Sequence, residues 1–264
     1  MIWRIFAVLS VVVLSYWYVT AHRQPSADGH RSLVITLGWI GTALTVLAAS
    51  LSIRKRMAYQ GAGKLSAWLA GHIYLGVVAA FAIFYHSGFR TGSPLTASLL
   101  AFFSLTVVSG LLGWWLSRAV PPLLTEIEET PAIQEQLLSV RAECLRGMLE
   151  LAAGGSAEFR AVVEQRLMKE TASWKRMVRF YRKQSTLSQE LPAFQKEHED
   201  DLRRLKQHEH RAFEKAAEYA LRANKMSAEL LLQRVLRGWL TLHMVNTAAM
   251  FGLAAIHIFS VLYF

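Results

Sequence analysis

The chain has 264 residues, of which 53% are hydrophobic and only 18% are charged. This composition is more apolar than that of an ordinary soluble domain, which disfavours a purely cytosolic enzyme. The single cysteine, Cys144, excludes a disulfide framework, a four-cysteine zinc site, an iron–sulfur cluster held by cysteines and a CxxCH cofactor attachment.

The net charge of +10 is unevenly distributed along the chain. Residues 119–237 hold 20 basic and 18 acidic side chains, whereas the other residues hold nine basic side chains and one acid, Asp28. The excess positive charge therefore lies in short loops between apolar segments. This pattern is typical of the flanks of a membrane protein, and it predicts no nucleic-acid partner.

Five apolar segments are long enough to cross a lipid bilayer as helices, which takes about 20 residues. The first segment also resembles a cleavable signal peptide, but its Tyr16-Trp17-Tyr18 cluster favours a retained helix at the membrane interface. The sequence therefore predicts an all-α integral membrane bundle of about five helices. The predicted membrane segments are residues 2–20, 33–53, 65–86, 95–116 and 239–264.

The basic residues of the short loops predict the orientation of this bundle. Loop 54–64 holds four basic residues, whereas loop 87–94 holds only Arg90. With loop 54–64 in the cytoplasm, the N-terminus and residues 119–237 are also inside, and the C-terminus is outside. The expected location is a cell membrane, most simply the bacterial inner membrane.

The sequence predicts that residues 119–237 form an all-helical cytoplasmic insertion. It follows four membrane helices (residues 1–118) and precedes a fifth (residues 238–264). Thr130-Pro131 can begin a helix that Gly154-Gly155 ends, and Ser156 can cap a second helix that reaches about Arg182.

Pro192 is expected to lie in a break between helices. No glycine or proline follows between Phe194 and Gly238, so a single helix is expected to extend roughly 65 Å and enter the fifth membrane segment. A coiled-coil-like heptad stripe on this helix can pack against the preceding helices, the simpler interpretation, or against a partner protein. The stripe comprises Leu202, Leu205, Glu209, Ala212, Ala216, Tyr219, Ala223, Met226 and Leu230.

Four histidines lie within the apolar segments. His72 and His86 are in the third segment and His243 and His257 are in the fifth, and each pair is separated by 14 residues. Fourteen helical residues return to within about 40° of the starting direction and rise about 21 Å, so each helix offers one imidazole near each leaflet. One segment lies between the two helices, which therefore cross in the same direction. His72 is expected to match His243 in depth, and His86 to match His257.

Two imidazoles that face each other at one depth can ligate a haem iron from both sides, which suits the iron to electron transfer. The alternative is that the histidines only pack or form hydrogen bonds between helices. Intramembrane ionisable residues are rare and commonly functional, and two pairs with identical spacing favour haem ligation. Zinc or copper transport is disfavoured because the membrane segments supply no carboxylate or thiolate ligand.

The paired H-x13-H segments resemble the dihaem cytochrome b and ferric-reductase-like membrane families, in which two helices each give two histidines to two b haems. The resemblance covers the third to fifth segments and implies two bis-histidine haems b. The chain departs from these families because it has no PEWY segment and no GxGxxG motif, and because residues 119–237 are foreign to both patterns. The residues that carry the resemblance are His72, His86, His243 and His257.

Haem propionates need cations near the membrane surfaces. Arg237, Lys64 and Arg54 are candidates on the inner side and Arg90 on the outer side, although each can equally be a snorkelling or topology-setting charge. Three glycines can allow close approach of a haem, or can simply serve helix packing: Gly71, Gly76 and Gly252.

These features predict a transmembrane dihaem cytochrome that carries electrons between a carrier or membrane quinone and a partner redox protein. No nucleophile–base arrangement or phosphate loop occurs, so the chain is expected to be an electron-transfer subunit of an oxidoreductase complex and to have no catalytic site of its own. The insertion would dock the partner. The alternatives are a membrane-anchored signalling or assembly protein with a coiled-coil output domain, and a haem-based sensor.

Overall fold

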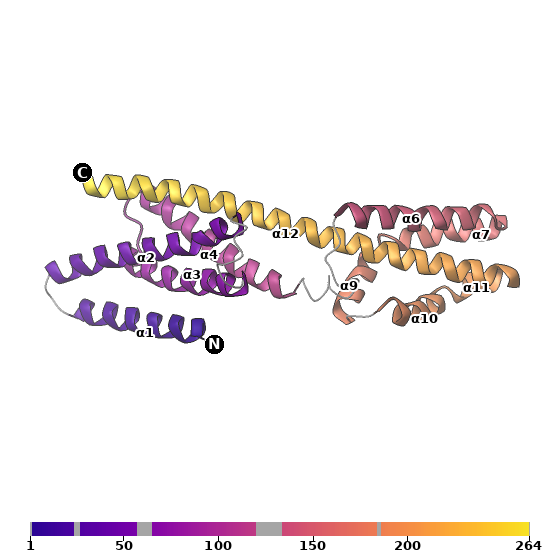
Figure 1. Cartoon of the computed structure of the whole chain (residues 1–264), viewed down its shortest axis with the longest axis horizontal. Helices are drawn as coiled ribbons and strands as arrows, with labels where there is room; N and C mark the ends of the chain where they lie inside the picture. Colours follow the sequence, from indigo (N-terminus) through magenta and orange to yellow (C-terminus); the bar gives the residue numbers. More distant parts are fainter. Residues whose placement is uncertain (1, 24–26, 57–64, 120–133, 184–185, 264) are drawn as a thin grey trace. The chain divides into compact units, whose positions relative to one another are not determined.

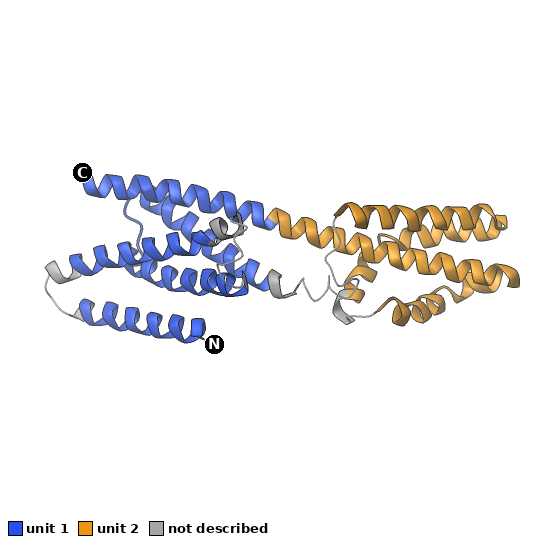
Figure 2. Cartoon of the chain, viewed as in Figure 1, with its two compact units in different colours: residues 1–115, 239–264 blue, residues 116–238 orange. Residues whose placement is uncertain are grey.

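The helices of the chain were located in a computed structural model, which describes residues 2–23, 27–56, 65–119, 134–183 and 186–263. Within these residues every regular element is helical and no strand occurs, which confirms the predicted all-α fold (Figure 1). The chain divides into two compact units (Figure 2). We call residues 1–115 with 239–264 the membrane unit and residues 116–238 the insertion.

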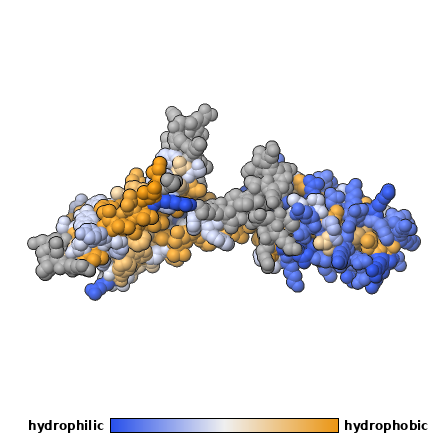
Figure 3. Space-filling model, turned by 90° about the horizontal axis from the view of Figure 1, so that it is seen from below, coloured by the Kyte–Doolittle hydropathy of each residue, from blue (hydrophilic) through white to orange (hydrophobic). Residues whose placement is uncertain are grey.

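Five helices in the described part of the chain are long and apolar enough to cross a membrane, as a multi-pass membrane bundle requires. Their surface is apolar, with Val12, Val108 and Val245 all more than half exposed on three different helices, and Figure 3 shows hydrophobic residues gathered over this unit. The helices are α1 (Ile2–Arg23), α2 (Ala27–Arg56), α3 (Leu65–Ser87), α4 (Pro94–Ala119) and the C-terminal half of α12 (His210–Tyr263).

Helix α3 packs between the other helices of the membrane unit. On one side Val78 and Ala82 of α3 join a buried cluster with residues of α1 and α2, including Leu14 and Leu37. On another side Ala80 packs with residues of α4 and α12. Any functional side chain on α3 is therefore held by neighbours on several sides.

The turn after α3 reverses the chain into α4. Gly88 and Phe89 both have a φ of 57°, in the left-handed region that glycine adopts readily and phenylalanine does not. The Phe89 amide donates to the carbonyl of Phe84 at 3.3 Å, and the two rings stack with centroids 6.0 Å apart. This closure caps α3 and places Arg90 in the exposed loop.

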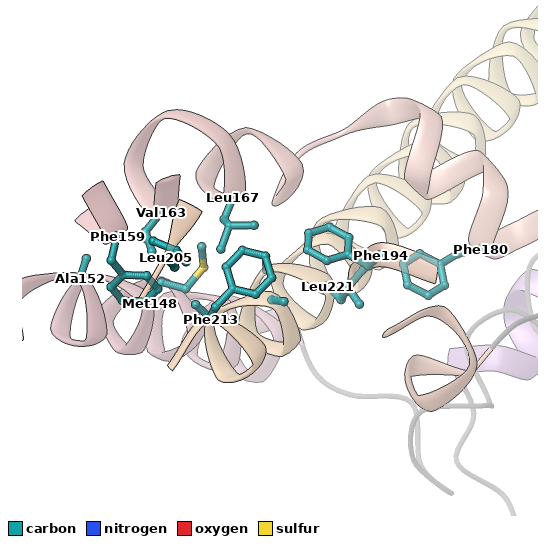
Figure 4. Close-up of a cluster of buried hydrophobic side chains, with 13 residues drawn as sticks. Met148, Ala152, Phe159, Val163, Leu167, Phe180, Phe194, Leu205, Phe213 and Leu221 are labelled. Carbon is teal, nitrogen blue, oxygen red and sulfur yellow. The ribbon is translucent and has the colours of Figure 1, made fainter. Parts of the chain in front are cut away.

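The insertion has its own hydrophobic core, built where α12 meets the shorter helices. Phe159, Phe194 and Phe213 are completely buried in it together with Met148 and Leu221 (Figure 4). The elements are α6 (Gln134–Ala153), α7 (Ala157–Val162), a π-helical turn (Val163–Leu167), α8 (Met168–Glu170), α9 (Trp174–Lys183), α10 (Leu187–Glu197), α11 (Glu199–Arg204) and a 3-10 turn (Gln207–Glu209).

Of the two predicted ends of the first insertion helix, only the C-terminal end can be compared with the structure. Its start at residues 130–131 lies outside the described residues, whereas α6 ends at Ala153, directly before Gly154-Gly155. Ser156 caps the next helix as expected, since its hydroxyl accepts the amide of Phe159 at 3.2 Å.

The prediction of one continuous second helix to about Arg182 is wrong, because the helix is interrupted between α8 and α9. The backbone carbonyls freed there are satisfied from α12. Asn224 donates to the carbonyls of Glu170 and Ser173, at 2.8 and 3.2 Å, and Ser227 donates to the carbonyl of Thr171 at 3.1 Å. These side chains lie more than 50 residues away in sequence, so local patterning could not reveal the break.

Two expectations for residues 192–209 are also wrong. Pro192 lies inside α10, where Glu190 and Phe194 are buried on one face of the helix. The long helix begins at His210, because the chain is extended at Leu205 and Lys206. The buried Glu209 carboxylate accepts the amide of Ser156 at 2.8 Å, and this bond lowers the pKa of Glu209.

From Ala212 onward the heptad stripe does lie on one helix, and α12 continues without interruption into the fifth membrane segment. The stripe packs within the chain: Ala216 and Tyr219 belong to the main core, and Met226 and Leu230 pack against Leu137 of α6.

Candidate functional site

Helices α3 and α12 bring the four intramembrane histidines together in two pairs. The ring centroids of His72 and His243 (the first pair) lie 6.3 Å apart with an interplanar angle of 78°. Those of His86 and His257 (the second pair) lie 6.3 Å apart at 73°. The two helices therefore run in the same direction, and the pairs have the partners that the sequence predicts.

The two histidines of α3 are each fixed by a backbone carbonyl of α2. His72 Nδ1 lies 2.8 Å from the carbonyl oxygen of Ala48, and His86 Nδ1 lies 2.7 Å from that of Val34. A carbonyl can only accept, so Nδ1 is the donor in both rings and Nε2 keeps its lone pair. Ala48 and Val34 are 14 residues apart, as are the histidines, so the antiparallel α2 repeats one contact at both pairs.

His243 has its Nδ1 partner on a different helix. Its Nδ1 lies 2.7 Å from the hydroxyl oxygen of Ser109 on α4. The Ser109 hydroxyl also lies 3.0 Å from the carbonyl of Thr106, and when it donates there its oxygen accepts the Nδ1 proton of His243. Three of the four imidazoles thus have an Nδ1 partner that can accept a hydrogen bond, which suits the neutral tautomer with Nε2 as a free electron-pair donor, the state in which histidine binds metals.

A cavity opens beside the first pair. Its walls come from α2, α3, α4 and α12 and are mainly small or apolar, including Ala49, Val77 and Phe103. Gly76, one turn after His72, faces open space, because a Cβ built there would meet no atom within 4 Å. A flat apolar ligand could therefore lie against the backbone at this position.

The three glycines that the sequence singles out have different surroundings. Gly71 lies against Trp3 of α1, whose ring would be 3.2 Å from an added Cβ, so helix packing explains this glycine. A Cβ at Gly252 would meet nothing within 4 Å, as at Gly76. A fourth glycine, Gly38, does more for the site than the sequence indicates, because it contacts the ring of His86.

The four cations proposed for propionate binding have different surroundings. Arg90 is exposed in the loop four residues after His86. Arg237 donates to the side chain of Gln134 in the insertion. The side chains of Arg54 and Lys64 lie outside the described residues.

Outside the pairs, the described residues offer little further metal-binding chemistry. They include no group of three or more histidine, cysteine or acidic side chains that could hold an ion. Cys144 is buried in the insertion, where desolvation raises the pKa of its thiol.

Sequence reasoning missed the partners that orient the histidines. Val34 and Ala48 act through backbone oxygen, which leaves no signal in the side-chain pattern. Ser109 and Gly38 are small residues in apolar segments, where helix packing is the default explanation. The signal that could have found them is their position opposite a histidine at a register set by the antiparallel helices.

The chain matches no protein-family model, no curated protein sequence and no solved structure. The geometry of the two pairs is therefore what indicates a function, and the resemblance to the dihaem cytochrome families stays a prediction.

Proposed function

We propose that this chain is a transmembrane b-type cytochrome subunit that binds two haems and carries electrons across a membrane. Each haem is held between one histidine of α3 and one of α12: the first haem by His72 and His243, the second by His86 and His257. The observation that carries the proposal is the shared spacing of the pairs, 6.3 Å between ring centroids in both.

That spacing suits an iron atom held between two imidazoles. A metal–nitrogen bond of about 2 Å, with a further ~1.1 Å from the nitrogen to the ring centroid, gives roughly 6.3 Å across both ligands. Imidazoles that only packed together could adopt a range of distances of about 4.5–7 Å. Two independent pairs at the same spacing favour a common ligand.

The donor set also suits haem better than a bare ion. Each pair supplies two imidazoles, whereas a zinc ion takes about four ligands from its surroundings. A porphyrin brings four nitrogens of its own and needs only the two axial donors. The apolar cavity at the first pair and the open space at Gly76 suit a flat macrocycle.

Haem supplies a one-electron iron couple when it is bound, and two axial histidines leave no position for oxygen or substrate. His72, His86 and His243 have Nδ1 partners in Ala48, Val34 and Ser109, which would leave Nε2 to hold the iron and would raise ligand basicity. The two pairs are separated by 14 residues, or about 21 Å, along a bilayer core of about 30 Å. One site therefore serves each leaflet.

The electrons pass between a carrier or membrane quinone on one face and a partner redox protein on the other. The short-loop charges support an orientation with the N-terminus and the insertion in the cytoplasm and the C-terminus outside, and the membrane of this proposal is a bacterial inner membrane. On this proposal the chain works as an electron-transfer subunit of an oxidoreductase complex. The insertion, with its separate core, is the docking element for the partner.

Purification of the whole chain in detergent tests the proposal. The expected result is a reduced-minus-oxidised spectrum of a b-type cytochrome and a haemochrome assay that gives two haems per chain. A folded, helical protein without haem after expression with ample haem supply would overturn it. The uninterrupted α12 would then favour a signalling role, because it joins the insertion to the membrane unit as one helix.

A further inference from the structure

Helix α4 contributes no histidine, yet it contacts His243 through a polar residue. The Ser109 hydroxyl oxygen lies 2.7 Å from His243 Nδ1, and the hydroxyl can donate a hydrogen bond to the carbonyl of Thr106 at 3.0 Å while it accepts one from Nδ1. The ring of His243 can therefore rotate only by losing this hydrogen bond. In a segment surrounded by lipid, no bulk water replaces the lost partner.

A second contact through Ser109 holds the same ring. The indole Nε1 of Trp239 donates to the backbone carbonyl of Ser109 at 2.8 Å, and the indole stacks on His243 with centroids 5.6 Å apart and planes at 22°. A Cβ at Gly113 would come within 1.8 Å of this indole, so only glycine admits Trp239 there. Ser109 thus makes two contacts at this site. Its side chain contacts His243, and its backbone carbonyl contacts Trp239, whose ring stacks on His243.

Helix α12 is also fixed to α4 on the other side of His243. Asn246 donates to the hydroxyl of Thr106 at 2.6 Å and to the carbonyl of Phe102 at 2.9 Å. Trp239 lies four residues before the histidine and Asn246 three residues after it. The helix backbone is therefore anchored without the Ser109 hydroxyl, because Trp239 bonds to the Ser109 backbone and Asn246 bonds to Phe102 and Thr106. The hydroxyl is left with a specific effect on the ring plane of His243.

We infer that Ser109 is a positioning residue that fixes the plane of His243 relative to His72 and thereby tunes the haem of the first pair. The inference rests on the proposed function. The angle between two axial imidazole planes, 78° here, determines how the iron d orbitals split. A hydrogen bond from Nδ1 also makes Nε2 a stronger donor, which stabilises ferric iron and lowers the reduction potential.

The test compares three variants of the whole chain. Ser109→Ala removes the acceptor, and Ser109→Thr restores a hydroxyl at the same place. Ser104→Ala is the matched control, because Ser104 lies on α4 and its hydroxyl donates to the carbonyl of Leu100 of the same helix. Each protein is measured by electron paramagnetic resonance in the ferric state and by potentiometric titration of both haems.

In Ser109→Ala we expect the low-spin signal of one haem to shift, and the potential of that haem to rise, while the other haem is unchanged. Ser104→Ala should match the unmodified protein, and Ser109→Thr should return the signal and potential toward it. If Ser109→Ala loses the first haem and Ser109→Thr retains it with a native signal, the inference is also supported.

Two haems with unchanged signals and potentials in Ser109→Ala would overturn the inference and leave the proposed function intact. Loss of the first haem from both Ser109 variants would also overturn it, because side-chain volume and not the hydrogen bond would then matter. An unmodified protein that binds no haem would instead contradict the proposed function itself.

Discussion

The imidazole of His86 lies against Gly38 so closely that a Cβ at position 38 would come within 2.8 Å of its Nδ1. This approach of α2 is what allows the carbonyl of Val34 to accept the Nδ1 proton at 2.7 Å. The ring is therefore held by close packing against Gly38, which has no side chain, and by the backbone carbonyl of Val34. Both contacts lie on the Nδ1 side of the ring, and the ring centroid is 6.3 Å from that of His257.

Gly38→Ala should displace His86 and impair the second haem. The added methyl group would overlap the ring, so the histidine must move or lose its bond to Val34. We expect the haem content to fall from two toward one per chain, measured by haemochrome assay. Gly92→Ala is the control, because a Cβ there would meet nothing within 4 Å. Full haem content in Gly38→Ala would show that this contact does not orient the ligand.

Gly76→Val tests whether the cavity at the first pair holds a ligand. The space beside Gly76 is free of protein atoms, so the protein alone should accept the larger side chain. If a haem fills this space, the valine should expel or displace it, and one haem per chain should remain. Ala101→Val, on the exposed face of α4, is the control for added volume. A Gly76→Val protein with two unperturbed haems would place the ligand elsewhere.

The near-perpendicular rings of both pairs predict a specific magnetic signature. Axial imidazole planes at 78° and 73° leave two iron d orbitals almost degenerate, so both ferric haems should give strongly anisotropic low-spin signals. Frozen-solution electron paramagnetic resonance of the oxidised protein measures this. Signals with three well-resolved g values, typical of parallel imidazoles, would show that the rings rotate when the cofactor binds.

The helices of the membrane unit follow from the sequence because the bilayer imposes one rule on every apolar segment. A run of about 20 apolar residues can only satisfy its backbone as a helix. The partners of His72 and His86 follow from the same rule, since 14-residue spacing and helix direction determine which imidazoles meet. What no pattern could give is the set of groups that hold each ring, because these groups include backbone carbonyls at Val34 and Ala48.

The insertion was harder to predict because tertiary contacts override local pattern there. Pro192 lies inside a helix whose buried face includes Phe194. In contrast, the helix ends at Thr171 although no glycine or proline is near. Asn224 and Ser227 of α12 satisfy the backbone at that break. Such compensation from distant residues is not visible in a local sequence window.

An ion-pair network around the buried Arg176 should make the insertion sensitive to acid. Arg176 is 5% exposed and contacts both Glu170 and Glu197 at 2.8 Å. Burial alone would raise the pKa of Glu197, but hydrogen bonds from Arg179 and Arg176 outweigh burial, and the net shift is downward. Because the pKa of Glu197 is lower in the folded state than in the unfolded chain, the ionised carboxylate stabilises the fold at pH values above its ordinary pKa. This stability is lost as the pH falls through the pKa of the folded state.

We therefore expect Glu197→Gln to destabilise the insertion at neutral pH and the difference from the unmodified protein to shrink below about pH 4.5. Thermal unfolding followed by circular dichroism across this range provides the measurement. Glu199→Gln is the control, because the Glu199–Arg203 pair is exposed on both side chains and should contribute little. A difference that stays constant with pH would exclude titration of Glu197 as its source.

The most direct test of the central claim is the haem content of single and double histidine variants. If each pair holds one haem, then His72→Ala, His243→Ala and the His72→Ala/His243→Ala double variant should each retain one haem per chain, with the same spectrum. The His72→Ala/His257→Ala variant should retain none. Two haems in His72→Ala/His243→Ala, or one haem in His72→Ala/His257→Ala, would contradict the account.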